Sequence, residues 1–125
     1  MADDYDFEAP PSAEEWLALD EEERVARIEA AHRRTGAPVG QAAGVHASIH
    51  ATVENRLASG APSVVAAYDR CRAAGLDRHT TIHALASVVT RHIMAILQRE
   101  PGFDQATADR DFAAIDPARW HRRPR

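Results

Sequence analysis

Apolar residues recur at helical spacing along most of this 125-residue chain, and glycine or proline interrupts the pattern at short intervals. The clearest stripe belongs to a helix predicted over about 41–59 and consists of His46, Ile49, His50, Val53 and Leu57. No segment alternates between apolar and polar residues over the length of a strand. The sequence therefore predicts an all-α fold, a small bundle of about four to six helices with short loops.

Capping residues and chain breakers predict where these helices begin and end. Ser12 opens a capping box, and Asp20 and Asp77 are expected to be further N-caps. Gly60 and Gly75 are expected to follow the ends of two helices. The predicted helices cover roughly residues 13–20, 21–34, 41–59, 62–74, 77–99 and 104–115.

The length of the chain allows one domain with its own core, and we place this domain at residues 12–118. Residues 1–11 are acidic and end in Pro10–Pro11, so a disordered acidic tail is predicted there. Residues 119–125 are rich in arginine and are predicted to form a basic C-terminal tail.

Composition argues against several function classes. The net charge of −4 argues against nucleic acid as a partner, and the absence of lysine excludes Schiff-base and P-loop chemistry. Cys71 is the only cysteine and is predicted to be a buried, small apolar residue. No apolar run approaches the roughly 20 residues that span a bilayer, and the acidic N-terminus does not resemble a signal peptide. We therefore expect a cytoplasmic protein without a membrane partner.

Two His-x-x-x-His pairs, His46/His50 and His79/His83, fall near the starts of two predicted helices and on their core-facing stripes. Residues four apart in a helix lie on one face with Cβ atoms about 5–6 Å apart, so both imidazoles of a pair can bind one ion. Short loops predict that these two helices run parallel, with both pairs at the same level. The four imidazoles are then expected to surround one metal ion.

Glu54 lies one helical turn after His50 and is the carboxylate nearest to the histidine pairs in the helical pattern. It cannot easily share an ion with His46, because eight residues of helix span about 12 Å. Three roles are open to Glu54: a metal ligand, the acceptor for the second N–H of a ligand histidine, or a catalytic general base. A site of two histidines and one carboxylate is also compatible with His50, Glu54 and one of His79 or His83.

Imidazole and carboxylate donors suit zinc or iron, with nickel and copper as further candidates. The pattern is not that of a zinc protease, because Ala47 stands where such an enzyme has its glutamate base. It is not that of a di-iron bundle either, which needs Glu-x-x-His pairs and more carboxylates. The remaining histidines, His32, His92 and His121, are predicted to be surface residues.

Three stretches of the chain are WLALDEEER at residues 16–24, HASIHATVEN at residues 46–55 and GLDRHTTIHA at residues 75–84. Together they resemble a group of short, uncharacterised bacterial proteins classed only as a domain of unknown function. The resemblance covers roughly residues 14–115 and departs at Arg56, where glutamine is expected. It carries no established activity, so it supports the choice of histidines and Glu54 without implying a reaction.

The leading hypothesis is a metal-binding helical protein with His46, His50, His79, His83 and Glu54 as ligand candidates. Whether the ion acts on a small-molecule substrate, which would make the protein a small metalloenzyme, is left open. The alternative is a non-catalytic homodimer that joins through an apolar helix face and holds a buried His/Glu hydrogen-bond cluster. A nucleic-acid role for the C-terminal arginines ranks third.

Overall fold

The computed structural model describes residues 5–35, 43–100 and 104–121, and these residues form seven α-helices and no strand. The prediction of an all-α fold is confirmed, and the described part of the chain holds one helix more than the predicted maximum. The helices are α1 (Ala13–Ala18), α2 (Glu21–Arg34), α3 (Ala43–Ala58), α4 (Pro62–Ala73), α5 (Arg78–Leu97), α6 (Gln105–Ala113) and α7 (Pro117–His121).

Local sequence signals set the ends of several helices. The predicted N-caps Ser12, Asp20 and Asp77 each accept a hydrogen bond from the backbone N–H three residues later. Gly60 and Gly75 follow α3 and α4 with φ angles of 76° and 96°, in the left-handed region that glycine adopts without steric cost. These predictions of helix boundaries are therefore confirmed.

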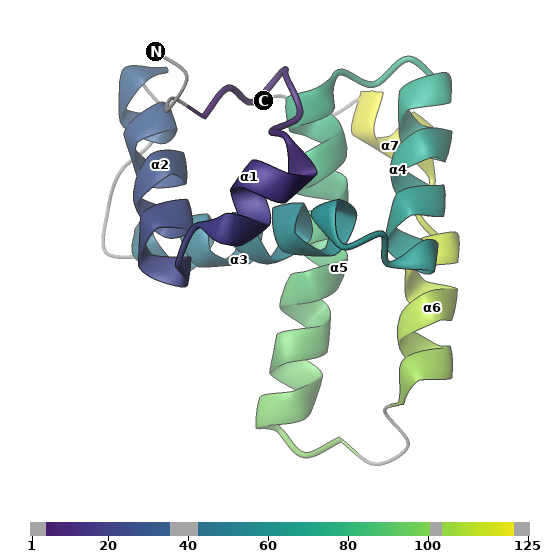
Figure 1. The fold of residues 1–125 in the computed structure, drawn as a ribbon. Coiled ribbons are helices and arrows are strands. Elements are labelled where there is room, and N and C mark those ends of the chain that lie inside the picture. Colours follow the sequence, from purple (N-terminus) through teal and green to yellow (C-terminus); the bar gives the residue numbers. More distant parts are fainter. Residues whose placement is uncertain (1–4, 36–42, 101–103, 122–125) are drawn as a thin grey trace.

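α3 runs across the middle of the molecule, with α2 and α5 packed against it (Figure 1). α4, α5 and α6 run in alternating directions, as their short connections favour (Figure 1). α3 crosses α5 and does not run alongside it, so the predicted parallel arrangement of the two histidine-bearing helices is wrong (Figure 1).

α3 crosses its neighbours because different faces of it enter two hydrophobic cores. The first core contains Tyr5, Phe7, Trp16, Ile28, Ala31, Ala47 and Ala51. The second core contains Val53, Val64, Ala67, Ile82, Leu85, Val88, Val89 and Phe112. By helical geometry, His46, His50 and Glu54 share a third face of α3, between those that enter the two cores. Glu54 on this third face contacts Arg78 at the start of α5.

The N-terminal segment 5–11 is packed against the helices, so the predicted disordered tail does not hold for these residues. Tyr5 and Phe7 are only 4% and 5% exposed. Arg34 on α2 holds the segment in place, because its Nη2 donates a hydrogen bond to the carbonyl oxygen of Tyr5 at 2.7 Å. Burial of two aromatic rings offsets the entropy cost of ordering the segment. Residues 1–4 lie outside the described residues.

α7 occupies the start of the predicted basic tail, which is therefore helical over residues 119–121. Nε2 of His121 donates a hydrogen bond to the backbone carbonyl of Ala74 at 2.8 Å and so ties α7 to the end of α4. The rest of the predicted tail, residues 122–125, lies outside the described residues.

α5 is the longest helix, and its C-terminal end extends beyond α3 (Figure 1). Four apolar side chains at this end are exposed: Ile93, Met94, Ile96 and Leu97. By length and composition alone α5 could cross a membrane. Core helices of folded proteins share this length and composition, and Ile82, Leu85, Val88 and Val89 of α5 are packed into the second core.

Candidate metal centre

Four histidines from three helices converge where α3 packs against α2 and α5. His32 comes from α2, His46 and His50 come from α3, and His83 comes from α5. One ring nitrogen of each lies within 4.8 Å of the corresponding nitrogens of the others. Nitrogens bound tetrahedrally to zinc at 2.0–2.1 Å are about 3.4 Å apart. Small side-chain movements would therefore bring all four nitrogens to one ion.

Several buried ring nitrogens in this region have no hydrogen-bond partner within the described part of the chain. They are Nε2 of His32, Nδ1 of His50, Nε2 of His79 and Nε2 of His83. An unsatisfied buried polar group costs on the order of 1–3 kcal/mol. A metal ion would satisfy such atoms, because it binds the lone pair of a neutral imidazole.

The hydroxyl of Tyr5 sets the orientation of His50. It donates a hydrogen bond to Oε2 of Glu54, and burial, followed by the charge of Glu54, raises the pKa of Tyr5, so the hydroxyl keeps its proton. Nε2 of His50 lies 3.3 Å from the same hydroxyl oxygen and acts as the donor to it, because the hydroxyl proton points to Glu54. Neutral His50 then carries its lone pair on Nδ1, the ring nitrogen without a partner.

His32 is oriented by its own helix. Its ring makes a hydrogen bond to the backbone of Ile28, and its Nε2 remains without a partner. The side chain is 7% exposed, so the prediction of a surface residue is wrong. The signal that could have identified it is its position four residues after Ile28, on the apolar stripe of α2.

Glu54 is not part of the four-histidine group, because Arg78 binds both of its oxygens. Nη1 of Arg78 lies 2.7 Å from Oε2, and Nη2 lies 2.8 Å from Oε1. Both side chains are buried, and Nε of Arg78 also donates to the hydroxyl of Tyr68 at 3.1 Å. This geometry does not favour Glu54 as ligand or general base. Of the three predicted roles, it comes closest to that of acceptor for a ligand histidine, although Glu54 reaches His50 only through the hydroxyl of Tyr5.

His79 lies beside the four-histidine group but does not belong to it. Its ring stacks on Phe7 with 3.8 Å between ring centroids, and its centroid lies 4.4 Å from that of His83. The structure thus brings His46, His50 and His83 together as predicted, with His32 in the place expected for His79.

The N-terminal segment covers one side of the histidines. The ring of Phe7 lies 4.8 Å from the ring of His32 and 5.3 Å from that of His50, measured between centroids. The carboxylate of Glu8 accepts hydrogen bonds from the first two backbone N–H groups of α5, at 3.0 and 3.2 Å. Sequence reasoning missed this segment, although Tyr5 and Phe7 are two of the chain's few aromatic residues.

Burial keeps the imidazoles neutral. Desolvation, followed by repulsion from neighbouring histidines, lowers the pKa of His32, His79 and His83 from 6.5 to about 4. The same causes hold the pKa of His50 well below 6.5, and partial burial lowers the pKa of His46. At neutral pH the cluster is therefore in the form that binds metal ions.

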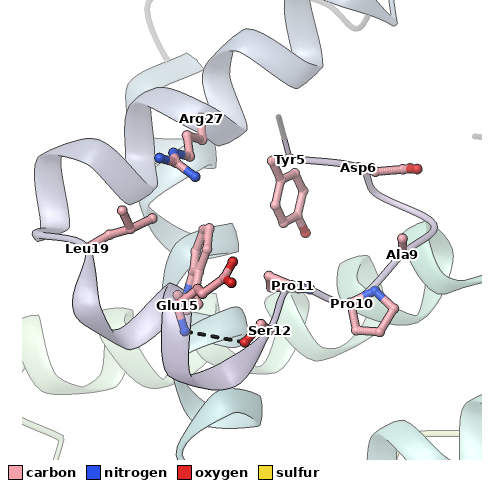
Figure 2. A pocket seen from close by; sticks show the side chains of 10 residues that line it. Tyr5, Asp6, Ala9, Pro10, Pro11, Ser12, Glu15, Leu19 and Arg27 are labelled. Atoms are coloured by element: carbon pink, nitrogen blue, oxygen red, sulfur yellow. Dashed lines mark hydrogen bonds between the residues drawn. The ribbon is translucent and has the colours of Figure 1, made fainter. Parts of the chain in front are cut away.

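A separate pocket of about 220 Å³ lies between the N-terminal segment, α1 and α2. Tyr5 and Trp16 contribute to its wall. The side chains of Glu15 and Arg27 also line the pocket and reach toward it (Figure 2). No histidine lines this pocket, so it is not the entrance to the histidine group. Tyr5 borders both regions.

Two further residues have structural roles outside the cluster. His92 is buried, contrary to prediction, and its Nε2 lies 3.0 Å from Oδ2 of Asp111, which joins α5 to α6. Cys71 is free and buried, as predicted. Burial raises the pKa of the Cys71 thiol, which favours a packing role over a nucleophilic one.

No family model, no curated protein and no solved structure matches this chain.

Proposed function

We propose that this protein binds a transition metal ion through His32, His46, His50 and His83. The observation that carries the proposal is the set of buried imidazole nitrogens without partners at the meeting point of three helices. Histidines that served only as packing residues would be expected to bond to backbone or side-chain groups through these atoms. An ion would satisfy several of them at once.

Zinc is the ion that this donor set favours. Four imidazole nitrogens match a tetrahedral zinc site, and no carboxylate belongs to the group within the described residues. The iron site of two histidines and one carboxylate loses support, because Glu54 is engaged by Arg78. Nickel and copper also bind imidazoles and are the other ions to test.

The surrounding hydrogen bonds resemble those that support metal ligands in other proteins. Ligand histidines commonly use their second ring nitrogen to bond a carboxylate, a backbone carbonyl or water. Here His50 reaches the carboxylate of Glu54 through Tyr5, and His32 bonds the backbone of Ile28. Both arrangements leave one ring nitrogen without a hydrogen-bond partner among the described residues. The proposal concerns binding, and no reaction is assigned to the ion.

Metal analysis of protein purified without an affinity tag tests the proposal. We expect about one zinc ion per chain, and loss of tight binding when His50 or His83 is replaced by alanine. His121→Ala is the matched control, because His121 lies on α7 and bonds the backbone of Ala74. Absence of metal from the purified protein, together with no zinc uptake by the metal-free protein, would overturn the proposal.

The alternative of a homodimer with a buried His/Glu hydrogen-bond cluster has weaker support. It requires hydrogen bonds among the histidines and Glu54, whereas Glu54 bonds Arg78 and Tyr5, and four buried ring nitrogens lack partners among the described residues. The exposed apolar end of α5 is the one observation in its favour. Light scattering distinguishes the two, since a dimeric mass that does not change with chelator would favour the alternative.

A further inference from the structure

The histidine group has no negatively charged member among the described residues. A neutral imidazole donates a lone pair but no charge, so a divalent ion bound by four of them keeps a charge of +2. His50 is buried and His83 is half-buried, so much of this charge would lie away from water. An uncompensated charge in such surroundings is costly unless an opposite charge comes close.

Among the residues that the structure describes, the carboxylates near the group supply little compensation. The buried carboxylate of Glu54 is neutralised by Arg78, which binds both of its oxygens. Glu8 is exposed and is bonded to the N-terminal backbone of α5. The guanidinium of Arg34, which is bonded to the carbonyl of Tyr5, adds positive charge to the same side of the molecule. The balance of charge around the group therefore favours a negative ligand from solution.

We propose that the metal-loaded site takes a small anion as a ligand on the ion, entering beside His46. This inference rests on the proposed function. His46 is the exposed member of the group, so its side is where a solute can reach the ion. The anion adds as a fifth ligand or replaces His46, and zinc accepts both geometries. The ligand class is a small monoanion with an oxygen or nitrogen donor, such as hydroxide or the carboxylate of a small molecule.

Cobalt(II) is a suitable probe, because its visible spectrum responds to changes in coordinated ligands. Equilibrium dialysis first establishes that cobalt binds to the metal-free protein. The cobalt protein is then titrated with sodium azide and sodium acetate, with sodium perchlorate as the control for ionic strength. We expect a saturable spectral change with azide or acetate and none with perchlorate. A spectral change as the pH is raised above 7, where the imidazoles are already neutral, identifies hydroxide as the anion and also supports the inference.

Two variants of His46 whose new side chains have equal size distinguish an effect of charge from an effect of access to the ion. His46→Asp supplies an internal anion at the entrance, whereas His46→Asn removes the imidazole without adding charge. Both variants lose one imidazole and should bind cobalt more weakly, so both are titrated at a cobalt concentration that equilibrium dialysis shows to fill the site. Both should fold, since His46 is exposed. Azide should bind to His46→Asp about tenfold more weakly than to His46→Asn.

The outcomes are distinguishable. Failure of cobalt to bind would overturn the proposed function and this inference with it. Binding of cobalt with a spectrum that responds neither to azide, acetate nor pH would overturn the inference alone. Equal azide affinity in the Asp and Asn variants would also overturn it, because the compensation of charge would then play no part.

Discussion

Arg78 and Glu54 form a buried two-point ion pair that joins the start of α5 to the C-terminal half of α3. The paired distances are 2.7 and 2.8 Å, and the two side chains are 2% and 1% exposed. Because the Tyr5 hydroxyl bonds Glu54 and also lies within reach of His50, the ion pair is connected to the histidine group. The pair therefore bears on both the stability and the metal affinity that we expect of this protein.

Replacing Arg78 tests the contribution of the ion pair to stability. Arg78→Met leaves the buried carboxylate of Glu54 without its partner and should lower the free energy of unfolding by about 3–5 kcal/mol. Urea denaturation at pH 7 measures the loss. Adding Glu54→Leu to this variant should recover part of it, since no buried charge then remains. A double variant whose loss equals the sum of the two single losses would contradict this account.

Tyr5→Phe tests whether the hydroxyl supports His50 as a ligand. Loss of the hydroxyl removes the hydrogen-bond acceptor of Nε2, and we expect zinc affinity to fall about tenfold, the lower end of such effects. Competition with a chelator of known affinity measures it. Tyr68→Phe is the matched control, because both hydroxyls contact Arg78 and only that of Tyr5 reaches His50. An equal loss of zinc affinity in the two variants would show that the effect passes through Arg78.

Phe7→Ala tests the docking of the N-terminal segment. Phe7 is 5% exposed and stacks on His79, so its truncation should cost about 3–5 kcal/mol of stability in the metal-free protein. Phe7→Leu should cost less, because it keeps most of the buried apolar volume. Thermal and urea unfolding both measure the change. A loss below about 1 kcal/mol for the alanine variant would instead fit an undocked segment.

The stability of the metal-free protein should fall as the pH is lowered from about 6.5 to about 4. The pKa of His32, His79 and His83 is about 4 in the folded protein and 6.5 ordinarily. Between these values the unfolded chain binds protons that the folded chain does not, so acidification favours unfolding. Above pH 6.5 these histidines are neutral in the folded and the unfolded protein, so they do not change the free energy of unfolding with pH. Urea midpoints from pH 4 to 8 measure the effect, and a midpoint that rises on acidification through this window would contradict it.

Zinc should raise stability most at neutral pH and lose its effect over the same acidic window, because protons compete for the imidazole lone pairs. Thermal unfolding with and without zinc at pH 7.5 and pH 5 measures this. A chelator should reverse the increase at pH 7.5. An equal effect of zinc at both pH values would point to a site without histidine ligands.

The sequence by itself determined the helical class, the caps at Ser12, Asp20 and Asp77, and three members of the histidine group, His46, His50 and His83. These are local properties. Residues four apart share a helix face in any helix, and a capping side chain bonds to a backbone group three residues away. No knowledge of distant contacts is needed to predict them.

Only the tertiary structure decided which fourth histidine completes the group and what Glu54 does. α3 crosses α5 because its faces enter two separate cores, and this crossing brings His32 into the group and leaves His79 beside it. Arg78 meets Glu54 from another helix, 24 residues along the chain, where local spacing carries no information. The choice between ligand and ion-pair partner depends on long-range burial, since a buried carboxylate needs an opposite charge close by.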